Sequence, residues 1–248
     1  MGKDWKRALI VGASSGIGES LALLLGKQGC AVAMVARRNE ELVRIASEIE
    51  RQGGGPVYCY PHDVRDTGKA AALFQQITHD LGGLDLIIYS AGVMPLVTDE
   101  EYSLDKDMNI IDVNVKGAVA WLNEAARRFA SEGKGTLAGI SSVAGDRGRR
   151  GMPVYSSSKA FFDAYLEGLR NRISRFGVTV VTAKPGPVDT PMTHGLKKLP
   201  MLISSEQAAI SILKSCERGG VTYIPGKWKP IMWVVRHIPS PIFRRMNI

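Results

Sequence analysis

The sequence predicts one α/β domain in which a parallel sheet is covered by helices on both faces. Short apolar runs alternate with longer amphipathic stretches, and the apolar runs are apolar throughout rather than at every second position. Strands that are buried on both faces show this continuous pattern, and a strand–helix alternation makes neighbouring strands parallel. The length of 248 residues suits one domain of this larger type.

The elements follow one another in a regular order. Strands are predicted at residues 7–11, 30–35, 56–60, 84–89, 136–140, 178–183 and 221–224. Helices are predicted at residues 16–28, 40–51, 67–81, 104–130 and 153–176. Right-handed crossovers then give a doubly wound, seven-stranded sheet with its ligand crevice beyond the carboxyl ends of the strands. We expect one domain over residues 1–225 and a basic amphipathic tail over residues 226–248.

The composition is that of an ordinary globular protein, with 45% hydrophobic and 23% charged residues. Cys30, Cys59 and Cys216 are too few and too scattered for a disulfide framework, so a reducing compartment is expected. No grouping of Cys and His predicts a metal site. The chain shows neither a secretory signal nor a run of 18 apolar residues, and we expect a cytoplasmic protein.

The net charge of +8 is concentrated toward the end of the chain, where residues 218–248 carry Lys and Arg but no Asp or Glu. Such a basic segment suits an anionic substrate, a membrane surface, nucleic acid or plain solvated surface. No nucleic-acid-binding motif accompanies it, so no nucleic-acid partner is expected. Trp228, Trp233 and Phe243 among the basic residues suit either a helix lying at a membrane surface or a segment docked on the core or on another subunit.

A glycine-rich turn follows the first strand. Gly12, Gly16 and Gly18 stand in the segment VGASSGIGES, directly before the first predicted helix. Glycine permits a tight turn and close backbone approach, and a helix N-terminus offers free N–H groups to a pyrophosphate. This context predicts a Rossmann-type dinucleotide site. Its expected contacts are Gly12, Ser14, Ser15, Gly16, Ile17 and Gly18.

The end of the second strand bears on the choice of cofactor. An acidic residue there would accept a hydrogen bond from the ribose 2′-hydroxyl of NAD(H), but the chain has Arg37 and Arg38. Guanidinium groups suit the 2′-phosphate of NADP(H). Alternatively, the two arginines merely begin a surface helix, although cations oppose the dipole at a helix N-terminus. NADP(H) is therefore favoured over NAD(H).

Three residues predict acid–base chemistry. Tyr155 and Lys159 are four residues apart on a predicted helix, so their side chains share a face. A free tyrosine has a pKa of about 10, and a neighbouring ammonium group lowers it. Ser142 stands at the end of the fifth strand, where a hydroxyl can donate to a substrate carbonyl.

Through these motifs, over residues 5–225, the chain resembles the short-chain dehydrogenase/reductase family. The resemblance implies that Tyr155 exchanges a proton with the substrate, that Lys159 also binds the nicotinamide ribose, and that Asn114 helps to hold a relay water in a locally distorted helix. It implies a homodimer or homotetramer formed through the fourth and fifth helices. Val11 and Ser90 depart from the usual Thr and Asn. The further cofactor contacts that it implies are Asp63, Val64, Ser90, Ala91, Gly92, Pro185, Gly186, Val188 and Thr190.

The substrate side is less sharply defined. Arg147, Arg149 and Arg150 suit a phosphate or carboxylate on the substrate, but equally a solvated loop or a subunit contact. Residues 191–203 form a predicted lid with Met and Leu side chains, which suit a hydrophobic ligand or ordinary packing.

The C-terminal half looks more specifically like the decaprenylphosphoryl keto-pentose reductases, through SSVAGDRGRR, VYSSSKA and RHIPSPIFRRMNI. This resemblance implies a lipid-linked carbonyl substrate. The alternatives are a reductase of soluble keto-acyl, steroid or xenobiotic carbonyl compounds, and a cofactor-binding regulator without activity. The presence of Ser142, Tyr155 and Lys159 disfavours the regulator.

Overall fold

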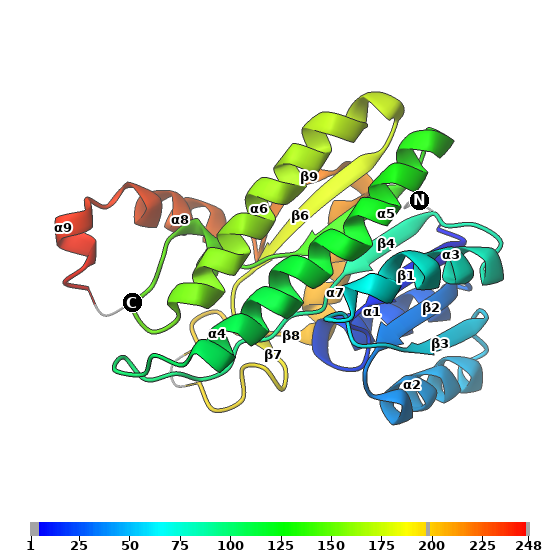
Figure 1. Cartoon of the computed structure of the whole chain (residues 1–248), viewed down its shortest axis with the longest axis horizontal. Helices are drawn as coiled ribbons and strands as arrows, with labels where there is room; N and C mark the ends of the chain where they lie inside the picture. Colours follow the sequence, from blue (N-terminus) through cyan, green and yellow to red (C-terminus); the bar gives the residue numbers. More distant parts are fainter. Residues whose placement is uncertain (1–4, 197–198, 247–248) are drawn as a thin grey trace.

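The computed structural model describes residues 5–196 and 199–246. Seven parallel strands form one sheet in the order β3-β2-β1-β4-β5-β6-β9 (Figure 1). The strands are β1 (Arg7–Val11), β2 (Ala31–Ala36), β3 (Val57–Pro61), β4 (Leu86–Tyr89), β5 (Thr136–Ile140), β6 (Thr179–Pro185) and β9 (Gly220–Ile224). This order confirms the predicted doubly wound, Rossmann-type fold.

Helices cover both faces of the sheet (Figure 1). One face carries α3 (Ala70–Asp80), α5 (Ala118–Glu132) and α6 (Pro153–Ile173). The other carries α1 (Gly16–Lys27), α2 (Asn39–Arg51) and α7 (Ser205–Arg218). Short 3-10 turns η1 (Thr67–Lys69), η3 (Val143–Asp146) and η4 (Ser174–Phe176) complete the connections.

Each face of the sheet has its own apolar core. Trp121, Phe129 and Phe162 are buried between the sheet and the α3–α5–α6 layer. Leu21 and Ile45 are buried with other aliphatic side chains between the sheet and the α1–α2–α7 layer. Burial on both faces explains why the strands are apolar throughout.

The helix predicted at residues 104–130 is interrupted. It consists of α4 (Leu104–Ile110), the π-helical segment η2 (Ile111–Gly117) and α5. The buried Tyr89 hydroxyl donates a 2.7 Å hydrogen bond to the carbonyl of Val113. A Cβ atom at Gly117 would lie 2.7 Å from that hydroxyl oxygen, so only glycine leaves room for it. A tyrosine on the neighbouring strand thus contacts the wider helical turn. Such π-helical turns often occur at functional sites.

Three further elements lie outside the predicted set. Helix α7 begins with a capping box, in which Ser204 and Gln207 exchange side-chain and backbone hydrogen bonds. Strands β7 (Val188–Asp189) and β8 (Ile203–Ser204) pair in parallel across the predicted lid, of which residues 197–198 lie outside the described chain.

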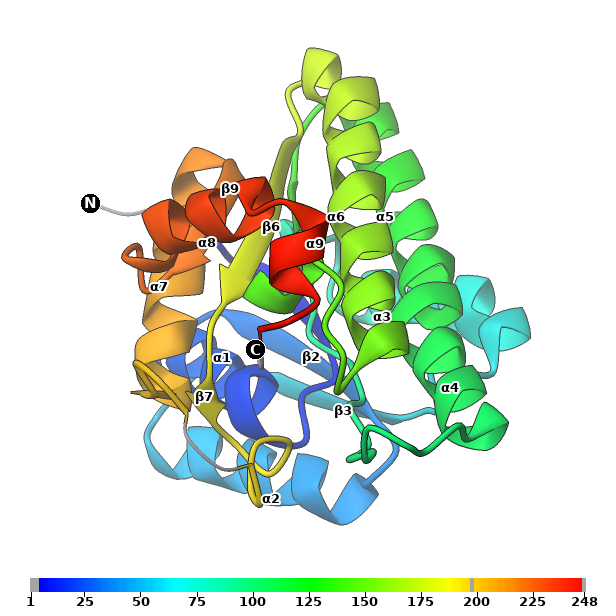
Figure 2. The same ribbon diagram turned by 90° about the vertical axis from the view of Figure 1, so that its left-hand side faces the viewer.

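The predicted tail contains α8 (Trp228–His237) and α9 (Ser240–Phe243), while residues 247–248 lie outside the described chain. Helix α8 contacts η3 and β9, and α9 continues outward from it at one edge of the molecule (Figures 1 and 2). The side chains of Trp228 and Met232 are buried against Val143, so the start of α8 packs on the core. Among the described residues, no helix is long and apolar enough to cross a membrane.

Candidate active site

A cleft of about 520 Å³ opens at the carboxyl ends of the strands. Strands β1 and β4 are neighbours from which the chain winds in opposite directions, the usual place for a ligand in this type of sheet. All predicted site residues line this cleft except Gly18 and Asn114. Those that do are Gly12, Ser14, Ser15, Gly16, Ile17, Arg37, Arg38, Asp63, Val64, Ser90, Ala91, Gly92, Ser142, Tyr155, Lys159, Pro185, Gly186, Val188 and Thr190.

The glycine-rich turn is held tightly between β2 and β4. The amides of Gly12 and Ala13 donate to the Val35 carbonyl at 2.7 and 3.2 Å. Gly12 has a φ of 93°, and a Cβ atom there would overlap the backbone of Ala91. A Cβ atom at Gly18 would overlap the Gly12 carbonyl. Gly18 is therefore needed for the shape of the turn rather than for contact with a ligand.

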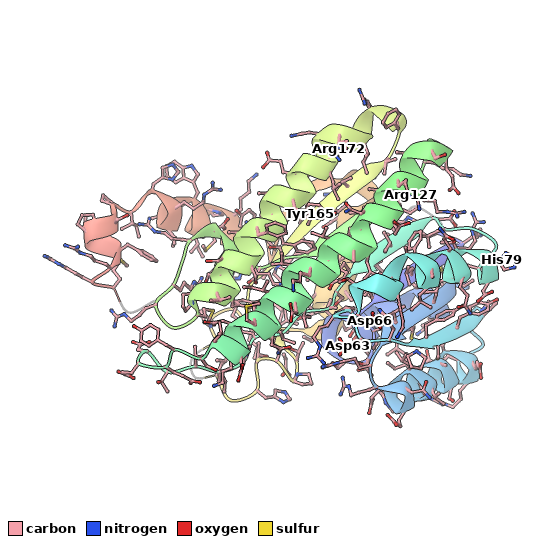
Figure 3. The ribbon with its side chains drawn as sticks, in the orientation of Figure 1. Asp63, Asp66, His79, Arg127, Tyr165 and Arg172 are labelled. Atoms are coloured by element: carbon pink, nitrogen blue, oxygen red, sulfur yellow. The ribbon has the colours of Figure 1, made fainter. Side chains whose placement is uncertain are left out.

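The two arginines after β2 both line the cleft. The Arg38 guanidinium donates to the carbonyl and the hydroxyl of Ser14 at 3.1 and 3.0 Å, which places it over the glycine-rich turn. Nearby, Asp63 accepts 2.9 and 2.6 Å hydrogen bonds from the Arg65 side chain, and these hold the pKa of Asp63 below its usual value. Figure 3 shows Asp63 on the segment that follows β3. The turn and its arginines thus fit a phosphate-bearing dinucleotide.

Ser142, Tyr155 and Lys159 meet in the deeper part of the cleft. The Ser142 hydroxyl accepts a 3.1 Å hydrogen bond from the Ala144 amide and lies close enough to Tyr155 to lower the pKa of its phenol. The Lys159 ammonium donates to the Ile140 carbonyl at 3.0 Å and lies 5.8 Å from the centre of the Tyr155 ring. The fold thus joins residues from the end of β5 to the first two turns of α6.

Burial is the main influence on the pKa values of Tyr155 and Lys159. It raises the pKa of Tyr155 above its usual value, while the Ser142 hydroxyl and the charge of Arg149 lower it. Burial lowers the pKa of Lys159 to about 8, and the carboxylate of Asp163 opposes that change. At neutral pH the phenol is therefore protonated and Lys159 is still largely an ammonium ion.

Asn114 lies behind the cleft in the π-helical segment. Its amide oxygen accepts from the Val93 amide at 2.8 Å, and its amide nitrogen donates to the Val93 carbonyl and the Ser158 hydroxyl, both at 3.1 Å. A Cβ atom at Gly92 would lie 3.5 Å from the Asn114 amide oxygen and 3.6 Å from the Lys159 nitrogen. Asn114 therefore ties the segment after β4 to α6 beside Lys159.

A buried ionic cluster beneath the site has no counterpart in the sequence-based prediction. The Lys184 ammonium lies 2.6 Å from both Asp146 and Asp163. The Tyr223 hydroxyl donates to the Asp146 carboxylate at 3.0 Å. These residues come from η3, α6, β6 and β9, so no local pattern reveals the cluster. It links the segments that carry Ser142 and Lys159.

The substrate side of the cleft is lined by residues from separate segments of the chain. Arg149 and Met152 come from the loop before α6, and Trp228 comes from α8. A Cβ atom at Gly186 would overlap the Trp228 indole, so the tail reaches the segment after β6. The buried indole N–H has no hydrogen-bond partner among the described residues. In the same part of the chain, no group of His, Cys, Asp or Glu side chains is arranged to hold a metal ion.

Comparison with known proteins agrees with this geometry. The family model for short chain dehydrogenases matches residues 6–199. An uncharacterized oxidoreductase from Myxococcus xanthus is 32% identical over 245 residues, covering 97% of this chain and 95% of its own. The chain therefore belongs to the short-chain dehydrogenase/reductase family and is an oxidoreductase. Members of this family bind NAD(P) and act on small-molecule substrates.

Solved structures show the same fold. A short-chain dehydrogenase/reductase from Mycobacterium marinum superposes with a TM-score of 0.82 at 26% identity, covering 90% of this chain and 95% of its own. One from Serratia marcescens has a TM-score of 0.78 at 26% identity, covering 88% and 95%.

Proposed function

We propose that the chain is an NADP(H)-dependent enzyme that interconverts a carbonyl group and an alcohol, with Tyr155 as the general acid and base. The observation that carries this proposal is the grouping of Ser142, Tyr155 and Lys159 inside a cleft that also contains the glycine-rich turn. A turn that fits a dinucleotide and a protonated phenol lie in one cleft. This combination suits hydride transfer coupled to proton transfer.

The chain's own residues divide the work as follows. The Ser142 hydroxyl donates to the carbonyl oxygen of the substrate and polarises it. Tyr155, which burial keeps protonated at neutral pH, gives its proton to that oxygen. The Lys159 ammonium stabilises the phenolate left behind, and Asn114 helps to hold a water that replaces the proton. A nicotinamide held in the cleft would supply the hydride, and alcohol oxidation is the reverse reaction.

The residues that would hold the cofactor extend along the cleft. The turn from Gly12 to Gly18 would receive the pyrophosphate, and Asp63 with Val64 would border the adenine. Arg37 and Arg38 would pair with a 2′-phosphate, which favours NADP(H) over NAD(H). The nicotinamide end would be held by Ser90, Ala91, Gly92, Lys159, Pro185, Gly186, Val188 and Thr190.

For the substrate we propose a hydrophobic carbonyl compound, with the lipid-linked keto sugar implied by the sequence resemblance as one example. Met152, Met192, Leu196 and Leu199 line the cleft and support this choice, because flexible apolar side chains fit irregular apolar ligands. A soluble keto-acyl, steroid or xenobiotic carbonyl compound is the alternative.

We further propose a homodimer or homotetramer that uses α5 and α6. These helices lie side by side on the outside of the molecule, and Figure 3 shows Tyr165 on α6 and Arg127 on α5. The rings of Phe161 and Tyr165 stack at 5.9 Å on this face, and 42% of Phe161 is exposed.

A contact between the tail and an anionic membrane surface is a separate proposal. Trp233 and Val234 on α8 are 64% and 54% exposed, and basic residues flank the helix. Exposed aromatic and aliphatic side chains beside Lys and Arg favour the interface of such a membrane.

Replacement of Tyr155 by Phe tests the acid–base assignment. The variant keeps the ring and loses only the hydroxyl, so it should bind NADPH normally. Turnover on a panel of ketones and aldehydes should fall by about 100-fold or more, since general acid catalysis contributes roughly 10²- to 10⁴-fold. NADPH binding by fluorescence titration is the control, and turnover near that of the wild type would refute the assignment.

The cofactor preference has its own test. Wild-type protein should bind NADPH more tightly than NADH. An Arg37→Ala/Arg38→Ala variant should lose about 10-fold or more in affinity for NADPH, because each charge-assisted pair contributes roughly 1.5–3 kcal/mol. Its affinity for NADH should change little. An equal loss for both cofactors would contradict the assignment of the 2′-phosphate to these arginines.

A further inference from the structure

The fold gives the three arginines of the loop between Ser142 and Tyr155 different surroundings. The Arg147 guanidinium donates to the carbonyls of Val235 and Ile238 at 2.8 and 2.5 Å, and it lies 4.1 Å from the centre of the Phe243 ring. Arg147 therefore holds the tail. The Arg150 guanidinium lies 3.5 Å from Asp99, and both side chains are largely exposed. It forms a surface ion pair.

Arg149 is different from both. It lines the cleft, its side chain is partly buried, and its guanidinium makes no hydrogen bond or ion pair with any described residue. The nearest carboxylate that acts on it belongs to Asp146, whose oxygens already receive Lys184 and Tyr223. The fold thus leaves one partly buried guanidinium without an anionic partner among the described residues.

The charges along the cleft show what this guanidinium can bind. Among the described residues, the charged side chains that line it are four cations, Arg37, Arg38, Arg149 and Lys159, and one anion, Asp63. Asp63 is already bound by Arg65 and lies at the end where the dinucleotide is proposed to sit. The substrate end therefore carries a positive charge with no anion to balance it.

A partly buried cation has lost some of its hydration, and a bound anion offsets that loss. Burial lowers the pKa of Arg149, but a guanidinium remains charged at any physiological pH. Arg149 also lies close enough to Tyr155 for its charge to lower the pKa of the phenol. An anion bound to Arg149 therefore lies near the reacting group of the substrate.

We propose that Arg149 determines substrate specificity by pairing with a phosphate or carboxylate that the carbonyl substrate itself carries. Because Met94, Met152 and Met192 line the same end of the cleft, the rest of that substrate is apolar. The inference rests on the proposed carbonyl chemistry, and it narrows the substrate to amphiphilic anions. The guanidinium fork suits both phosphate and carboxylate.

Matched substrate pairs test this specificity. Dihydroxyacetone and dihydroxyacetone phosphate share a ketone and differ in one anionic group, as do methyl benzoylformate and benzoylformate. Wild-type enzyme with NADPH should prefer the charged member of each pair. Arg149→Gln should raise KM for the charged members by about 10- to 100-fold, as expected for a lost charge-assisted hydrogen bond, and leave the neutral members within about twofold.

Arg150→Gln is the matched control, since it removes an arginine from the same loop without touching the cleft. It should leave the kinetics of all four compounds unchanged. Arg149→Lys keeps a positive charge without the planar fork, so its KM values should fall between those of the wild type and Arg149→Gln. If Arg149→Gln is poorly folded, the lysine variant still decides the matter by the same comparison.

A binding measurement keeps this inference separate from the proposed reaction. Calorimetry on the NADPH-bound protein compares inorganic phosphate with geranylgeranyl phosphate, which carries the same group on a lipid. Arg149→Gln should weaken binding of the lipid phosphate by about 10-fold or more. A stronger interaction with the lipid phosphate than with inorganic phosphate indicates a lipid-linked source, and equal affinities indicate a free phosphate compound.

The outcomes are distinguishable. If no member of either pair is reduced but Arg149→Gln still weakens phosphate binding, the substrate site stands and the proposed reaction does not. If charged and neutral ketones are reduced equally well by the wild type, or if both respond equally to Arg149→Gln, the role of Arg149 is overturned. The role is also overturned if phosphate binding does not depend on Arg149.

Discussion

Replacement of Lys159 by Met should stabilise the cofactor-free protein while abolishing turnover. The Lys159 side chain is only 6% exposed and carries its charge into the core. Burial lowers its pKa from 10.5 to about 8, a difference that corresponds to roughly 3 kcal/mol between the charged and neutral forms. Methionine fills a similar volume without a charge.

Part of that gain is offset by lost interactions. The Lys159 ammonium donates a 3.0 Å hydrogen bond to Ile140 and lies 5.8 Å from the rings of Tyr155 and Phe162. These contacts stabilise by about 1–2 kcal/mol together, so the net gain from the substitution is about 1–2 kcal/mol at neutral pH.

The dependence of stability on pH tests the cost of burying the Lys159 charge most directly. Below pH 8 Lys159 is protonated in both the folded and unfolded states, so the cost of burying its charge is fully present. Between pH 8 and 10.5 only the unfolded state keeps the proton, and the wild type gains stability relative to the variant by about 1.4 kcal/mol for each pH unit.

Urea denaturation of both proteins between pH 7 and pH 9.5 measures this difference. The advantage of Lys159→Met should shrink as the pH rises above about 8. The reasoning is refuted if the variant is less stable than the wild type by more than about 1 kcal/mol at pH 7, or if the stability difference does not change with pH. Turnover should be lost throughout this range.

The remaining predictions concern the pH profile, the π-helical segment and the glycine-rich turn. The kcat/KM for carbonyl reduction should fall as the pH rises through about 8, because Lys159 then loses its proton; a profile flat to pH 10 would contradict this. Tyr89→Phe leaves the buried carbonyl of Val113 without its partner and should cost about 1–3 kcal/mol in urea denaturation, and a loss below about 0.5 kcal/mol would count against the role of this hydrogen bond. Gly18→Ala places a Cβ atom against the Gly12 carbonyl and should weaken NADPH binding by about 10-fold or more in a fluorescence titration, whereas unchanged affinity would show that the turn adjusts freely.

The composition of the tail leaves its surroundings open, and only the packing of α8 decides between them. Its aromatic and basic residues are compatible with a membrane surface, a partner subunit or the core. In the fold, Trp228 is buried against Gly186 and lines the cleft, whereas Trp233 is exposed. Two tryptophans five residues apart therefore have different surroundings, and only their place on α8 distinguishes them.

Much of the fold could be predicted because its signals are local. Most strands of the main sheet are apolar runs, and the turn glycines follow the first of them directly. Helix α7 was missed, although the Ser204–Gln207 capping box is a recognisable start signal. The distortion of the helix around Asn114 was implied by the family resemblance alone, and no local pattern predicts the hydrogen bond from Tyr89 on a strand to Val113.

The sequence by itself determined the fold class, the enzyme family and many of the residues that line the cleft, because those properties are carried by short motifs and by periodicity. Only the tertiary structure decided which of the three loop arginines faces the cleft, that Trp228 reaches the site from the tail, and that Lys184 joins Asp146 to Asp163. These properties depend on which distant segments pack together. The other arginines of this loop find partners in the fold, whereas the guanidinium of Arg149 finds none among the described residues.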